Sequence, residues 1–141
     1  MNKEVTKMPI VGFNFDKITV EKTGKITGKL DIKQSTGIKR IEQEKLLLGT
    51  PEQVLKFGFE YKIDYDKIGE ILLLGHVLYL EEPKKIKLIL DQWKKDKKVD
   101  REIMQQVINT ILFKCTIKAL NLAQEVGLPP PIKLPMVQPK K

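Results

Sequence analysis

Apolar and polar positions alternate most regularly in the middle of the chain. From Leu55 to Tyr65 every second residue is apolar or aromatic, and the residues between them are charged or glycine. This pattern is typical of a strand with one buried face and one face in water. The next run, 71–80, is apolar at nearly every position, which predicts a strand in the centre of the sheet.

Shorter alternating segments precede this pair. Apolar residues at 18–20 and 26–32 are separated by Thr23 and Gly24, a pattern that predicts a hairpin. Phe15 lies on the opposite parity from the 18–20 segment, so a bulge is expected near Asp16 if one strand contains both.

The segment 34–52 is longer than a hairpin turn needs. It carries Ile38, Ile41 and the consecutive leucines Leu46, Leu47 and Leu48. Part of it is either a further strand or a loop that packs across the sheet.

The C-terminal half predicts two helices. From Pro83 an amphipathic stripe contains Ile86, Ile89, Leu90 and Trp93. A longer helix is expected over 100–126, because its apolar residues recur at steps of three and four, and Gly127 followed by prolines should stop it. Four strands followed by two helices predict an α+β fold, a four-stranded antiparallel sheet with both helices packed on one face.

Composition limits the class of protein. The 141 residues fit a single domain over 1–141, with residues 1–10 and 138–141 expected to be flexible ends. A single cysteine, Cys115, excludes an internal disulfide framework. No apolar run is long enough to cross a bilayer and no signal-peptide pattern is present, so a cytoplasmic protein without membrane insertion is expected.

The net charge of +8 raises the alternative of a basic nucleic-acid-binding module. Arginine, which suits base reading and bidentate phosphate contacts, is rare, and the densest basic cluster, 84–98, flanks the amphipathic stripe of the first predicted helix. A solvated helix face explains this cluster without a partner. One continuous basic stripe would favour nucleic acid, whereas an apolar groove rimmed by lysines would favour a polypeptide.

The sequence offers little for catalysis. His76 is the only histidine and lies in the most apolar predicted strand, with no serine or cysteine at a motif spacing. Cys115 falls on the apolar stripe of the long helix, where a thiol behaves as a small hydrophobe. The glycines form neither a dinucleotide fingerprint nor a Walker loop. We therefore expect no enzyme, no cofactor and no metal site.

The C-terminal segment 109–137 resembles the end of the SecB export-chaperone family. The resemblance rests on the Ile111-Leu112-Phe113 triplet, the helix length, the stop at Gly127, the prolines and the spacing of Ile132, Leu134 and Val137. It implies a protein-transport chaperone that works without ATP, holds unfolded or nascent polypeptides in apolar surface grooves and assembles as a dimer of dimers. The family's docking to a basic motor ATPase is not carried over, because well-known members are acidic and this chain is basic.

We therefore predict a set of polypeptide-binding residues and a set of oligomer-interface residues. The polypeptide-binding set comprises Ile38, Ile41, Leu46, Leu47, Leu48, Phe57, Phe59 and Tyr61. For Phe57 and Phe59, packing in the core beneath the long helix is the favoured explanation, so the leucines are the stronger candidates. The oligomer-interface set comprises Ile86, Ile89, Leu90 and Trp93, because two apolar helix stripes exceed what one small sheet covers. An oligomeric scaffold or antitoxin-associated factor with the same fold is a further alternative.

Overall fold

The computed structural model describes residues 10–25, 28, 30–44 and 53–132. Its described part contains four strands and two helices, in the predicted order of strands first and helices last. In chain order these are β1 (Ile10–Lys22), β2 (Lys33–Glu44), β3 (Gln53–Asp64), β4 (Gly69–Glu81), α1 (Pro83–Asp96) and α2 (Arg101–Val126).

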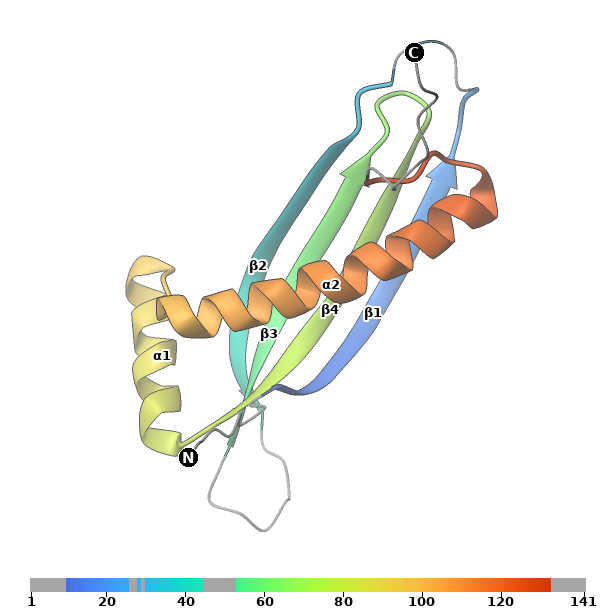
Figure 1. Ribbon diagram of the computed structural model, residues 1–141. Helices are drawn as coiled ribbons and strands as arrows, with labels where there is room; N and C mark the ends of the chain where they lie inside the picture. The colour runs from blue at the N-terminus through green and yellow to red at the C-terminus, as the bar shows by residue number, and fades with distance from the viewer. Residues whose placement is uncertain (1–9, 26–27, 29, 45–52, 133–141) are drawn as a thin grey trace, which may run out of the picture.

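The strands form one antiparallel sheet in the order β1-β4-β3-β2 (Figure 1). The predicted hairpin around Thr23 and Gly24 is wrong, because β1 and β2 lie at opposite edges of the sheet. The second strand is Lys33–Glu44, so most of it comes from the segment that the sequence left open between strand and loop. Local alternation predicted strands here, but it carries no information about which strands become neighbours.

The predicted bulge and the central strand are both confirmed. The register of β1 against β4 shifts between Phe15 and Lys17, which leaves Asp16 as the extra residue. β4 lies between β1 and β3, as its apolar run indicated. On β3 the alternate residues from Leu55 to Ile63 are buried, in agreement with the sequence pattern.

The two helices cover one face of the sheet. α2 packs on β1, β4 and β3, while α1 packs on β2 and β3 at the other side (Figure 1). With 26 residues, α2 is about 39 Å long and reaches across the sheet. It ends as predicted, because Gly127 adopts φ 74° and its N–H returns to carbonyls of the last turn.

A contact from the sheet to the chain after α2 fixes the end of this helix. Tyr65 donates its hydroxyl to the carbonyl oxygen of Pro129 at 2.7 Å. The sequence predicts that Ile132, Leu134 and Val137 pack back on the domain. Leu128 is buried next to Gly69, but Ile132 is 39% exposed, so the predicted packing of Ile132 is not found. Leu134 and Val137 lie outside the described residues.

The opposite face of the sheet carries no helix, and we call it the open face. Its β4 residues are Leu72, Leu74, His76, Leu78 and Leu80, all half-buried. Charged residues of β3 pair beside them in the register, such as Lys62 opposite Leu72. Neither helix of the described chain is long and apolar enough to cross a membrane.

Candidate functional site

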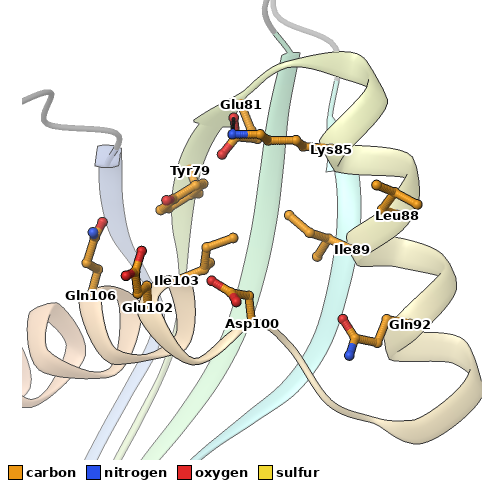
Figure 2. Close-up of a pocket in the computed structure, with 10 residues that line it drawn as sticks. All are labelled: Tyr79, Glu81, Lys85, Leu88, Ile89, Gln92, Asp100, Glu102, Ile103 and Gln106. Atoms are coloured by element: carbon orange, nitrogen blue, oxygen red, sulfur yellow. Dashed lines mark ion pairs between the residues drawn. The ribbon is translucent and has the colours of Figure 1, made fainter.

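A cleft opens between α1 and the start of α2, above the end of β4 (Figure 2). We call it the interhelical cleft. Its volume of about 380 Å³ lies within the range of about 300–1,000 Å³ that is common for ligand pockets. Its lining residues are Tyr79, Glu81, Lys85, Leu88, Ile89, Gln92, Asp100, Glu102, Ile103 and Gln106.

The cleft exists because the two helices diverge at their junction. α1 ends at Lys97, whose left-handed φ of 55° turns the chain, and α2 begins after Asp100. Figure 2 shows Ile89 of α1 and Ile103 of α2 extending toward each other, with Tyr79 of β4 behind them. Tyr79 and Ile89 are buried, so the floor of the cleft is apolar.

The mouth of the cleft is polar and more acidic than the chain as a whole. Glu81, Asp100 and Glu102 line it together with a single cation, Lys85. Lys85 Nζ lies 4.0 Å from a carboxylate oxygen of Glu81. Burial raises the pKa of Tyr79, and the three carboxylates raise it further because they disfavour the phenolate.

Leu88 is the most exposed apolar residue of the cleft. Its side chain is 68% exposed although it belongs to a 14-residue helix whose other large aliphatic residues are buried or half-buried. An apolar side chain that lines a cleft with a buried apolar floor offers contact area to an incoming apolar group.

A second exposed apolar region lies at the free edge of β1. Phe113 and Ile117 of α2 are 68% and 49% exposed, and Val11 of β1 is 48% exposed. Phe113 also lines a cleft of about 570 Å³ together with Ile10 and Phe13 of β1. We call Phe113 and Ile117 of α2, together with the outer edge of β1, the β1-edge patch. Within the described chain no strand pairs with the outer edge of β1.

The predicted polypeptide-binding residues fall into three environments. Phe57, Phe59 and Tyr61 are buried in the core on the helix-covered face, and Tyr61 hydrogen-bonds Thr116 of α2 at 3.2 Å. Ile41 is also buried, whereas Ile38 is half-buried against the core. None of these five presents a fully exposed side chain.

Leu46, Leu47 and Leu48 lie outside the described residues. The chain on either side of them is placed, because Glu44 pairs with Val54 and Gln53 pairs with Glu81. Glu81 is itself a lining residue of the interhelical cleft. The described residues Glu44 and Gln53 therefore lie at the same end of the sheet as the cleft.

The predicted oligomer-interface residues are partly core. Ile86 and Ile89 are buried within the chain itself, and Leu90 and Trp93 are half-buried against the core. Their stripe is thus accounted for by packing on the sheet without a partner chain. An interface through this stripe stays a prediction, and it could use only the remaining surface of Leu90 and Trp93.

His76 and Cys115 lie outside the cleft in structural environments. His76 Nδ1 lies 3.1 Å from the Asp16 carboxylate at the β1 bulge. Cys115 is fully buried, and burial raises the pKa of its thiol to about 12. Among the described residues, no group of three or more histidine, cysteine or acidic side chains is arranged to hold a metal ion.

Comparison with solved structures identifies a similar fold. The chain is similar to the Mycobacterium tuberculosis Rv1957 SecB-like chaperone, solved in complex with a ChAD peptide from the Rv1956 HigA1 antitoxin, with 11% sequence identity and a TM-score of 0.53. The similarity covers 94% of this chain and 91% of that chain. This protein has a SecB-like fold. No family model matches the chain, and no curated protein matches its sequence.

Sequence reasoning missed the interhelical cleft. Leu88 carried a signal, because it lies outside the stripe formed by Ile86, Ile89, Leu90 and Trp93 and yet is apolar. Ile103 was identified as part of the α2 stripe but not as a neighbour of α1. The angle between two helices depends on the junction at Lys97, which no periodicity reveals.

Proposed function

We propose that this protein is an ATP-independent chaperone that holds non-native polypeptides in the interhelical cleft. The observation that carries the proposal is this cleft, with an apolar floor and exposed Leu88, in a chain with a SecB-like fold. The solved SecB-like neighbour holds a peptide of an antitoxin. That complex supports polypeptide as the ligand class, but the position of the ligand here is our own proposal.

The cleft suits a short extended segment of a client. A bulky apolar side chain would enter between Ile89 and Ile103, and the client backbone would meet Gln92 and Gln106 at the mouth. Such amide side chains can donate and accept hydrogen bonds without selecting a sequence. That Leu46, Leu47 and Leu48 also contact the client stays a prediction from the sequence.

A matched pair of variants tests the site. Leu88→Ser removes apolar surface from the cleft, and Phe113→Ser removes it elsewhere from an equally exposed position. We expect Leu88→Ser to weaken client binding by about 1.5–3 kcal/mol, the contribution of one buried leucine. The measurement is light scattering of a guanidinium-unfolded enzyme diluted with each variant, with and without Mg²⁺-ATP.

The outcomes separate the alternatives. Phe113→Ser should retain suppression per folded protomer, and nucleotide should change nothing. Full activity of Leu88→Ser would exclude the cleft as the client site, and a requirement for ATP would contradict the holdase mechanism.

We also propose that the chain self-associates through the β1-edge patch. β1 is a 13-residue edge strand, and exposed strand edges in soluble proteins are usually covered or paired. A second copy could pair along β1 and cover Phe113 and Ile117 by the same symmetric contact. Sedimentation of Phe113→Ser/Ile117→Ser should show a smaller species than the parent chain; an unchanged species would place the interface elsewhere.

A role restricted to an antitoxin is the second candidate, favoured by the peptide bound to the SecB-like neighbour. Both roles would use the same cleft. They differ in selectivity: a general holdase suppresses aggregation of several unrelated unfolded proteins, whereas an antitoxin-associated factor binds one. Export and a cytoplasmic location stay predictions from the sequence.

A further inference from the structure

The exposed side of α1 next to the cleft is strongly basic. Lys84, Lys87, Lys94 and Lys95 are all exposed and recur at spacings that place them on one side of the helix. We call these four residues the lysine face. Residues 84–98 hold seven lysines and two aspartates, a net charge of +5 in a chain of net charge +8.

The four lysines have no carboxylate partners in the described chain. None of them lies within ion-pair distance of an acidic side chain there, although Asp91 lies among them on the same side of the helix, four residues from both Lys87 and Lys95. Neighbouring lysines are engaged: Lys85 lies near Glu81, and Lys97 lies 5.1 Å from the centre of the Trp93 ring. The lysine face therefore keeps its charge for a partner outside the chain.

The acidic mouth of the cleft confines that partner to the lysine face of α1. Glu81, Asp100 and Glu102 lie on the cleft side and repel an anion. A polyanion is thus guided along the lysine face, and client and polyanion would occupy adjacent sides of the same helix.

We propose that the lysine face binds the phosphodiester backbone of nucleic acid without sequence preference. Lysine ammonium groups act as point charges toward phosphates, and α1 offers no exposed arginine or aromatic side chain for reading or stacking on bases. Insertion of α1 into a lipid surface is disfavoured, because Ile86 and Ile89 are buried against the sheet.

The proposal predicts a defined salt dependence. Four lysines that neutralise about four phosphates give a slope of about −2.8 for log K against log salt on single strands, and about −3.6 on duplex DNA. Affinity for a single strand should then fall about fifty-fold between 50 and 200 mM salt.

The test uses the full chain and two charge-matched variants. Lys84→Gln/Lys87→Gln/Lys94→Gln/Lys95→Gln removes the lysine face, and Lys17→Gln/Lys22→Gln/Lys25→Gln/Lys67→Gln removes four exposed lysines outside it. Fluorescence anisotropy measures binding of a labelled 20-nucleotide oligouridine and of a 20-base-pair DNA duplex at several salt concentrations. Circular dichroism verifies that both variants remain folded.

The proposal expects the first variant to lose about tenfold or more in affinity, with a smaller salt slope, while the second stays near the parent chain. The relative affinity of the two oligonucleotides shows whether the lysine face prefers single-stranded RNA or duplex DNA. Equal losses of affinity in both variants would show that binding depends on net charge alone, and this would overturn the proposal. Tighter binding to polyglutamate, or to vesicles containing anionic lipid, than to either oligonucleotide would assign the surface to another partner and overturn it as well.

Discussion

Neighbouring leucines on β4 meet two different environments. Leu73 is fully buried on the helix-covered face, where it pairs with Ile18 and Tyr61. Leu74 is half-buried on the open face, between Lys17 and Glu60. An apolar strand such as β4 can therefore be central in a sheet without being covered by other elements on both faces. The long side chains of the neighbouring strands β1 and β3 are enough to half-bury the β4 leucines on the open face.

The largest expected effect is on stability, and it comes from replacing these two leucines by alanine. Leu73→Ala should lower the free energy of unfolding by about 2–5 kcal/mol, since it leaves a cavity under α2. Leu74→Ala should cost about 1 kcal/mol, because the site is already partly in water. Urea unfolding of both variants measures the two values. An equal loss of unfolding free energy in both variants would contradict this difference. It would show that a further segment or a second copy covers the open face.

The next effect concerns the predicted leucine site. Replacing Leu46 and Leu48 by serine should weaken client binding by about 1–3 kcal/mol per side chain, if each contacts the client as a buried leucine. Thermal stability should stay nearly unchanged, in contrast to Leu73→Ala. The measurements are client affinity by titration and a thermal melt. A variant that unfolds while folded molecules bind normally would assign these leucines to the core.

The smallest expected effect involves the backbone that anchors α2 over the covered face. Gly127→Val should lower the free energy of unfolding by about 1–2 kcal/mol, because φ of 74° is unfavourable for a β-branched residue. Space is not the cause, since the nearest atom to an added Cβ is the flexible Lys22 Nζ at 3.2 Å. Gly127→Asn, which tolerates this conformation better, is the control in the same urea experiment. Equal stability of the valine variant and the parent would contradict the argument.

Much of the fold could be predicted from local patterns. The alternation of β3, the apolar run of β4, the bulge after Phe15 and the stop at Gly127 are all confirmed. Each depends on a few adjacent residues, whose spacing follows from the geometry of a single strand or helix. The candidate site was predicted less well. Phe57, Phe59 and Tyr61 give the same alternating apolar pattern whether they pack in the core or bind a client.

The sequence by itself determined β3, β4, both helices, the end of α2 and the concentration of charge in 84–98, since these depend on residues close together in the chain. The tertiary structure alone decided that β1 pairs with β4 instead of β2, and that the helices cover only one face. It alone brought Ile103 opposite Ile89 and placed the carboxylates of Glu81, Asp100 and Glu102 around one cleft. Such features arise from contacts between residues distant in sequence, and periodicity within one element cannot encode them.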